Sequence, residues 1–374
     1  MLAHTRRAAS RLLAWYRATG RDLPWRRDPN PYRVWISEIM LQQTTVAVAG
    51  RYFERFISQY PTVWDLARAG DEDLLALWSG LGYYHRARNL LKAARIICER
   101  HGGEIPADAA SLRALPGVGP YTTGAILSIG HNIPVAALDG NTLRVGARLG
   151  AIQGDPKTAA VSRRIEDLVQ GMIPRRQASS FNQALMDLGA LVCTPLKPAC
   201  PACPLSADCL ATRRGLTARI PKPKRTARAV PVQMAAVAVR RGERCLLVQR
   251  SGGALMQGLW EFPLVSITSG GSTEGAIELA DRLGARLIGP VGRVSHSITN
   301  HRLRITVFAA RPAGARRSRA RVGRSLVVKD RPRLETGMEK VSRRWSSLSR
   351  VAAGNRLAVT ATALKIARLL EGIA

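Results

Sequence analysis

The stretch LPGVGPYT, residues Leu115 to Thr122, lies between two segments whose apolar residues recur at helical spacing. Gly117 and Gly119 allow a tight turn that presents backbone N–H groups outward. The helix that we expect from Tyr121 onward directs the positive end of its dipole the same way. This arrangement favours a backbone phosphate as ligand, because it offers donors without reading bases. An ordinary corner between helices also uses Gly and Pro, but L-P-G-V-G is more specific than a generic turn.

The segments around this turn predict an almost wholly helical region over residues 1 to about 210. Apolar residues recur at helical spacing in ISEIMLQQTTVAVAGRYFERFI, ARNLLKAARIICERH and RRIEDLVQGMI. Gly and Pro separate these segments, as in HGGEIP. No strand-like alternation of any length interrupts the pattern, so we expect a mainly α domain.

Four of the six cysteines lie in CTPLKPACPACPLSADC, residues 193–209. A chain of 374 residues can bury a core without disulfide staples, and its N-terminus resembles no secretory signal, so we expect an intracellular protein. Clustered thiols there are more often metal ligands. Structural zinc usually takes two close cysteine pairs, whereas this loop has one. Four thiolates in one compact loop favour an iron–sulfur cluster instead. The predicted ligands are Cys193, Cys200, Cys203 and Cys209.

Lysine and arginine number 57 against 26 aspartates and glutamates, which gives a formal net charge of +31. This excess suits a partner with a phosphate backbone, bound largely through counterion release. An arginine-rich proteome would produce the same excess, so charge by itself leaves both explanations open. No stretch reaches membrane-spanning length without charges, so we expect no membrane partner.

The pattern changes after a basic, proline-bearing segment, residues 212–231, which we interpret as a linker between domains 1–211 and 232–374. MAAVAVRRGERCLLVQR predicts two strands joined by a turn, and LRITVFAA predicts a third. The C-terminus ends in an amphipathic helical pattern, so the second domain is expected to be α+β. An arginine-rich insert from Ala310 to Glu335 is expected to be partly disordered.

LPGVGPYT, SEIMLQQTTV and the four-cysteine loop together resemble the endonuclease III superfamily of DNA glycosylases. LPWR, PYRVWISEIMLQQT, LWSGLGYYHRARNL, ALDGNTLRV and FNQALMDLGALVCTP follow in the order typical of the MutY family of adenine DNA glycosylases. The resemblance covers nearly the whole chain. It implies a helix-hairpin-helix at about residues 112–127 and a [4Fe–4S] cluster with a structural and DNA-sensing role. It also implies a monomer that acts on double-stranded DNA in the bacterial cytoplasm.

Removal of a base breaks the bond from a sugar carbon to a ring nitrogen, and it needs an acid for the base and a carboxylate for the sugar cation. Glu38 lies within the apolar pattern VWISEIML, so we expect a raised pKa. A solvent-facing helical glutamate is the plain alternative, but the resemblance implies that Glu38 protonates adenine and then activates water. Asp139 in ALDGNT would stabilise the cation. Asp139 is also a good helix N-cap, and the two roles are compatible.

The resemblance also implies that Asn141 and Tyr121 form hydrogen bonds around the sugar and the carboxylates. Bifunctional members carry lysine where this chain has Tyr121, so we expect a monofunctional enzyme that leaves the abasic strand intact. Gln43 and Tyr83 resemble residues that wedge into the duplex beside the lesion, although simple packing would also explain Tyr83. Further DNA contacts are expected from the hairpin residues Gly117, Val118 and Gly119.

LLVQRSGGALMQGLWEFPLV resembles the opening of a Nudix-type fold, as in the family's C-terminal domain. A Nudix hydrolase needs clustered glutamates for magnesium, and we expect no such site in TEGAIELADRLGA. Its only carboxylates are Glu274, Glu278 and Asp281. The resemblance implies instead that this Nudix-like domain recognises 8-oxoguanine. The family does so with a Phe-Ser-His motif, where HSITNHRL places Ile298, Thr299 and Asn300. Thr299 keeps the hydroxyl and Asn300 keeps a hydrogen-bonding side chain.

The sequence therefore predicts a DNA N-glycosylase, a hydrolase of N-glycosyl bonds, that acts in base excision repair. Its expected substrate is adenine mispaired with 8-oxoguanine or guanine. One alternative is a broader glycosylase for thymine and adenine mismatches. Another is a non-catalytic DNA-binding protein that keeps the cluster and the hairpin, and the presence of both Glu38 and Asp139 argues against it.

Overall fold

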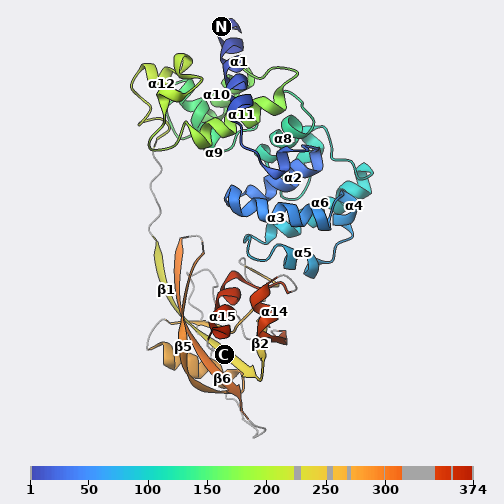
Figure 1. The fold of residues 1–374 in the computed structure, drawn as a ribbon, viewed down its shortest axis with the longest axis vertical. Coiled ribbons are helices and arrows are strands. Elements are labelled where there is room, and N and C mark those ends of the chain that lie inside the picture. Colours follow the sequence, from blue (N-terminus) through green and yellow to red (C-terminus); the bar gives the residue numbers. More distant parts are fainter. Residues whose placement is uncertain are drawn as a thin grey trace. The chain divides into compact units, whose positions relative to one another are not determined.

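A computed structural model describes residues 2–222, 229–250, 256–267, 271–298, 300–313, 342–354 and 357–372 (Figure 1). Contacts divide the chain into two compact units, residues 1–68 with 89–225 and residues 69–88 with 226–374. The segment 69–88, which the sequence places in the first domain, is therefore grouped with the C-terminal residues. Within the described residues, no helix is both long enough and apolar enough to span a bilayer.

The described chain up to residue 222 forms helices and short turns, as the sequence predicts. Asn30 caps one helix by accepting a hydrogen bond from the Arg33 backbone N–H, at 2.9 Å. Thr62 and Asp65 form a reciprocal capping box at the start of another. The helices are α1 (Leu2–Thr19), α2 (Pro31–Leu41), α3 (Val46–Gln59), α4 (Val63–Ala67), α5 (Asp71–Leu77), α6 (His85–His101), α7 (Ala109–Arg113), α8 (Pro120–Ala125), α9 (Gly140–Leu149), α10 (Ala159–Gln170), α11 (Ala178–Leu191) and α12 (Leu210–Arg213).

The main core of the first unit forms where α1, α9, α10 and α11 meet. Leu12, Phe181 and Leu188 are fully buried there. α9 and α10 approach closely at Gly146, where an added Cβ would lie only 2.6 Å from the Cγ2 atom of Ile165. This packing fixes α9 and α11, the two helices that carry much of the candidate site.

The helical core extends past the predicted domain boundary at residue 211. Ile220, inside the predicted linker, is buried, and its carbonyl accepts a hydrogen bond from Arg148 Nε at 2.8 Å. The first strand already begins at Val230, so Pro231 lies within a strand rather than in the linker. Proline is tolerated there because the start of a strand need not donate to a neighbour.

The described residues of the second unit form a mixed seven-stranded sheet of order β3-β2-β1-β6-β5, with β4 paired to β1 and β7 paired to β2. β1 and β6 are parallel, whereas β5 and β6 form an antiparallel hairpin. The strands are β1 (Val230–Arg241), β2 (Arg244–Gln249), β3 (Trp260–Glu261), β4 (Leu264–Ser266), β5 (Ala285–Ile298), β6 (His301–Pro312) and β7 (Arg343–Ser347).

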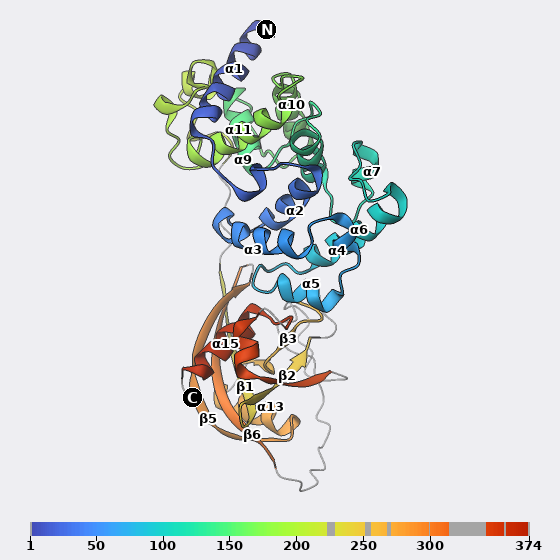
Figure 2. The same cartoon turned by 45° about the vertical axis from the view of Figure 1, so that its right-hand side comes forward.

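Helices cover both faces of this sheet (Figure 2). On one face, Val232 and Ile305 pack against α14 (Leu348–Ala353) and α15 (Ala361–Glu371). On the other, Val237 and Phe308 pack against α13 (Ser272–Arg282). The alternation of buried side chains along β1 and β6 follows from the two-residue period of a strand.

Four of the seven described strands were not predicted. β3 and β4 are only two and three residues long. β5 contains Gly289, Pro290 and Gly292, and its register with β6 shifts at these residues, which hides the alternation that marks a strand. β7 is short and lies in a segment from which we predicted only the terminal helix. β6 extends to Pro312, so the predicted insert starts later than Ala310, and its residues 314–335 lie outside the described chain.

Candidate active site

A cavity of about 550 Å³ opens in the first unit between α2, α8, α9 and α11. All four side chains predicted to be catalytic line it: Glu38, Tyr121, Asp139 and Asn141. Its remaining walls are partly apolar, with Trp25, Val34, Leu41 and Met186 among the lining residues. The fold thus brings together residues about one hundred positions apart in the sequence.

Glu38 lies in the second half of α2 and is only 5% exposed. The Tyr121 hydroxyl donates a hydrogen bond to Glu38 Oε2 at 2.6 Å. Burial raises the pKa of Glu38 to about 7, while the hydrogen bond from Tyr121 lowers it and the charge of Asp139 raises it. Glu38 can therefore give and take a proton near neutral pH, which is what a general acid needs.

Tyr121 is held by the hairpin that precedes α8. Gly117 adopts a positive φ of +81°, which glycine accepts without strain, and an added Cβ would lie 3.0 Å from Asn89 Cβ. Gly119 is extended, and nothing lies within 4 Å of the position of its missing Cβ. Val118 is different, because its side chain is buried and its N–H donates to the Leu115 carbonyl at 3.2 Å. Val118 therefore anchors the turn, and its contact with DNA stays a prediction.

Asp139 is the N-cap of α9, as its sequence context predicts. Its Oδ1 atom accepts hydrogen bonds from the backbone N–H groups of Asn141 and Thr142, at 2.9 and 2.7 Å. Its Oδ2 atom accepts a third from the Asn141 side chain, at 2.9 Å. Three donors therefore fix the orientation of a carboxylate at the cavity wall.

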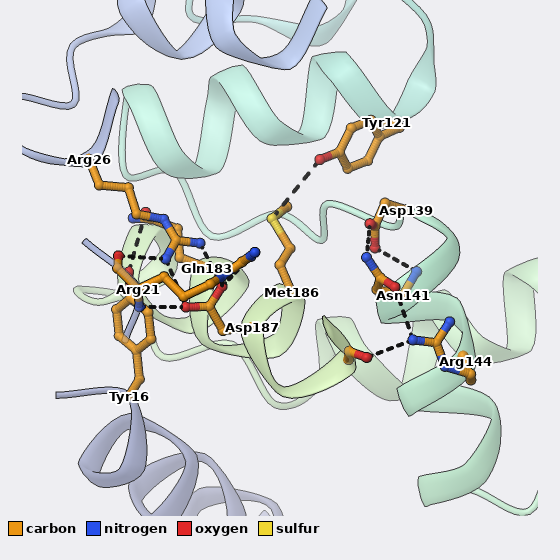
Figure 3. Close-up of polar contacts among 11 residues, drawn as sticks. Tyr16, Arg21, Arg26, Tyr121, Asp139, Asn141, Arg144, Gln183, Met186 and Asp187 are labelled. Atoms are coloured by element: carbon orange, nitrogen blue, oxygen red, sulfur yellow. Dashed lines mark hydrogen bonds and ion pairs between the residues drawn. The ribbon is translucent and has the colours of Figure 1, made fainter. Parts of the chain in front are cut away.

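Asn141 links this carboxylate to a buried arginine (Figure 3). Its Oδ1 atom accepts a hydrogen bond from Arg144 Nη2 at 2.9 Å, and the Arg144 Nε atom donates to the Cys193 carbonyl at 2.8 Å. Gly189 of α11 leaves room for the Asn141 side chain, since a Cβ added at residue 189 would lie 2.7 Å from Asn141 Cβ. The cysteine loop and Asp139 are therefore joined through two side chains.

The sequence interpretation missed a charged network on the opposite wall of the cavity, where Arg21 and Arg26 converge on Asp187 (Figure 3). Asp187 is fully buried, and the two Nη atoms of Arg26 donate to its two oxygens at 2.8 and 2.9 Å. Arg21 donates through its backbone N–H at 3.0 Å and through Nε at 2.8 Å. Burial would raise the pKa of Asp187, but the hydrogen bonds from Arg26 and Arg21 bring it below its usual value. The aspartate inside the apolar segment ALMDLGAL is the sequence signal that could have revealed this network, because a buried charge needs partners.

The two predicted wedge residues share an unusual backbone conformation. Gln43 has a φ of 58° and Tyr83 a φ of 49°, in the left-handed region that favours glycine. Such strained positions cluster at functional sites. The Tyr83 ring also has packing partners, with the Arg86 guanidinium 5.6 Å from its centroid and a perpendicular His85 ring at 6.2 Å.

The four clustered cysteines lie in one loop that packs on the core of α9 and α11. The pKa of Cys203 rises to about 11, because of burial and, less strongly, because of the neighbouring charges of Cys193, Cys209 and Cys200. Arg148 Nη1 lies 3.3 Å from the Cys193 sulfur. Among the described residues no group of three or more Cys, His, Asp or Glu is arranged as a metal site, yet the donor set of four neighbouring thiols suits a thiolate-bound cluster.

In the second unit, Thr299 lies outside the described residues. Ile298 ends β5 and packs on the core, and the Asn300 carbonyl accepts a hydrogen bond from the Val230 N–H at 2.8 Å. On α13, Glu274 accepts a hydrogen bond from the Gly271 N–H at 3.2 Å, as a helix cap. Glu278 and Asp281 are exposed on the same helix.

Comparison with known proteins assigns the two units. Residues 36–171 match the HhH-GPD superfamily of base excision DNA repair proteins. Over these residues the first unit is therefore similar to this superfamily. Residues 234–351 match the NUDIX domain, so the predicted order of a helical glycosylase-type domain and a Nudix-like domain is confirmed.

The chain is homologous to adenine DNA glycosylases, which confirms the resemblance. It is 38% identical to the enzyme of Rattus norvegicus over 312 residues, 70% of this chain and 60% of the rat protein. It is 44% identical to the enzyme of Buchnera aphidicola subsp. Schizaphis graminum over 201 residues, 54% of this chain and 58% of that protein. The matched region thus spans about 60% of the length of these relatives. A solved thermostable thymine-DNA glycosylase is 28% identical with a TM-score of 0.51, over 57% of this chain and 98% of that one.

Proposed function

We propose that this protein is a DNA N-glycosylase that removes adenine in base excision repair. One observation carries the proposal: a buried carboxyl group with a pKa of about 7, Glu38, shares a cavity with the fixed carboxylate of Asp139. Two carboxyl groups in such different environments can divide the roles of acid and cation stabiliser. Homology to adenine DNA glycosylases supports adenine as the base.

In the proposed reaction, adenine flips out of the duplex into the cavity. The protonated fraction of Glu38 gives its proton to a ring nitrogen of adenine. The bond from the sugar carbon to the base then breaks, and its electron pair leaves with adenine. Asp139 stabilises the resulting sugar cation. The Glu38 carboxylate takes a proton from the water molecule that attacks the sugar carbon. The products are free adenine and an abasic site.

The tyrosine at the hairpin sets the type of glycosylase. Tyr121 holds the acid through its hydrogen bond to Glu38, and the described residues that line the cavity include no lysine. A Schiff base with the sugar needs such an amine. We therefore propose a monofunctional enzyme that leaves the sugar–phosphate strand intact.

The proposal extends to the opposite base, 8-oxoguanine or guanine. The Nudix-like domain would read the oxidised base with Thr299 and Asn300, while Gln43 and Tyr83 would wedge into the duplex. The hairpin of Gly117 and Gly119 would hold a backbone phosphate, which the open space at Gly119 supports. The substrate would be bacterial DNA in the cytoplasm, bound by one copy of the chain.

We also propose that Cys193, Cys200, Cys203 and Cys209 hold a [4Fe–4S] cluster. When bound, the cluster would take four thiolates and tie the loop into one unit, with a structural and DNA-sensing role. The loop would in turn support Asp139 through Arg144 and Asn141, whose hydrogen bonds need no metal.

The test is base release from duplexes that carry adenine opposite 8-oxoguanine, adenine opposite guanine, or thymine opposite guanine. The first two should yield alkali-labile sites with the wild-type protein and none with Glu38→Gln. Release of thymine at a similar rate would favour a broader mismatch glycosylase. The similarity to a solved thymine-DNA glycosylase supports that alternative. Tight DNA binding without release of any base would favour a non-catalytic DNA-binding protein.

A further inference from the structure

Among the described residues, no helix covers one half of a sheet face in the second unit, and this half carries arginines. Along β6, Leu303 and Ile305 point to the face that packs on α14 and α15. Arg302 and Arg304 alternate with them and therefore point to the other face, where both are exposed. Further along the same strand, Phe308 and Ala310 of that face are buried beneath α13. Helix α13 thus covers only one end of this face (Figure 2).

The strand register extends this uncovered half across three strands. Arg302 pairs with Ser297 of β5 and Arg304 pairs with Ser295, and both serines are exposed. Arg293 is the next residue of β5 on this side, and it is exposed as well. On the other side of β6, Pro231 of β1 pairs with Arg302, and Gln233 of β1 pairs with Arg304.

We call this surface the arginine half-face. It is formed by Arg293, Ser295, Ser297, Arg302 and Arg304. None of its side chains is a carboxylate. None of the ion pairs found in the described parts of the chain involves its three arginines. Its two hydroxyl side chains can donate hydrogen bonds. Three unneutralised guanidinium groups with hydroxyls between them form a surface complementary to phosphate groups.

We propose that the arginine half-face binds the phosphate backbone of duplex DNA. The Cα atoms of alternate residues on a strand lie about 7 Å apart, so Arg302 and Arg304 can engage separate phosphates rather than compete for one. The half-face also lies at the end of the β5–β6 hairpin that carries Asn300, which is proposed, together with Thr299, to read the oxidised base. The inference rests on the proposed function, and it assigns the backbone contacts of the second unit to this surface.

The test compares binding of a fluorescent duplex, undamaged or with adenine opposite 8-oxoguanine, as salt concentration rises. Each lost phosphate contact lowers the slope of log affinity against log salt by about 1. The variant Arg302→Gln/Arg304→Gln should therefore lose about 2 units of slope and bind about tenfold more weakly at moderate salt. The variant Arg302→Lys/Arg304→Lys should keep most of the slope, since lysine also pairs with phosphate.

The matched control is Arg286→Gln/Arg311→Gln. These two arginines are also exposed and also pair across β5 and β6, but at the far end of the hairpin. The change in charge is identical, so the control should keep the wild-type slope. An unchanged slope in Arg302→Gln/Arg304→Gln, or an equal loss in the control, would overturn the assignment. Adenine release by the wild-type protein is measured separately, so failure of the enzymatic proposal would show there and not in the slopes.

Discussion

Glu38 is the residue on which the proposed chemistry depends, and its burial has an energetic consequence. Its pKa in the folded protein is about 7, above the ordinary value of 4.5. The stability linked to the protonated group is therefore complete below pH 4.5 and is lost as the pH rises through 7. At pH 8 the ionised carboxylate costs the fold about 3 kcal/mol, because each pKa unit corresponds to about 1.4 kcal/mol.

Glu38→Gln removes this cost while it keeps the size of the side chain. We expect the variant to unfold at higher urea concentration than the wild type at pH 8, with a difference that shrinks towards pH 5. Urea titrations at the two pH values measure this. Equal gains at both pH values would contradict a raised pKa.

The Tyr121 hydroxyl counteracts the rise in the pKa of Glu38 by donating a hydrogen bond to its carboxylate. Tyr121→Phe removes that donor, so the pKa of Glu38 should rise further. The alkaline limb of the single-turnover rate of base release should then move to higher pH than in the wild type. A limb at the same pH would show that this hydrogen bond does not set the titration of the acid.

Asp187 neutralises two arginines from a fully buried position. Asp187→Asn leaves their charges uncompensated and should lower the free energy of unfolding by about 3–5 kcal/mol. The control is Asp22→Asn, which breaks the exposed pair with Arg27, where both side chains are more than half exposed. It should change stability little, because solvent screens such pairs. Similar losses in the two variants would argue against the buried network.

Between helices, the contact of α11 with the start of α9 depends on one glycine. Gly189→Ala would place a methyl group 2.7 Å from Asn141 Cβ, so Asn141 and Asp139 must shift. We expect a fall in the single-turnover rate of at least tenfold, because small displacements of catalytic groups are costly. The matched control, Gly50→Ala in α3, meets nothing within 4 Å and should stabilise the protein by about 1 kcal/mol without changing the rate. Equal rates in the two variants would show that this contact does not position Asp139.

The helices of the first unit and the strands β1, β2 and β6 could be predicted, since patterns such as ARNLLKAARIICERH depend on local periodicity. β5 could not, because its bulges at Gly289 and Pro290 interrupt the alternation. The environment of Glu38 followed from its apolar neighbours in VWISEIML. The partners of Asp187 could not be predicted from the sequence. Arg21 and Arg26 lie more than 160 positions away from it in the chain, and no local pattern encodes such a pair.

Across the whole molecule, the change from helical to strand patterns near residue 230 predicted two domains, while the exact division depends on packing. Ile220 belongs to the helical core by its burial, and residues 69–88 are grouped with the C-terminal unit by their contacts. Neither assignment is encoded in local composition. In the proposed function, the first unit removes the base, and the second unit contacts the opposite base and its backbone. The separate sites of the two units would then take part in one reaction.

The decisive measurement is the release of free adenine, detected by mass spectrometry, from a duplex with adenine opposite 8-oxoguanine under single-turnover conditions. The wild-type protein should release one adenine per duplex, and the strand should break only after alkali treatment. Glu38→Gln should bind the same duplex and release none. No adenine from the wild-type protein, or an equal yield from Glu38→Gln, would contradict the assignment of a buried acid that removes adenine.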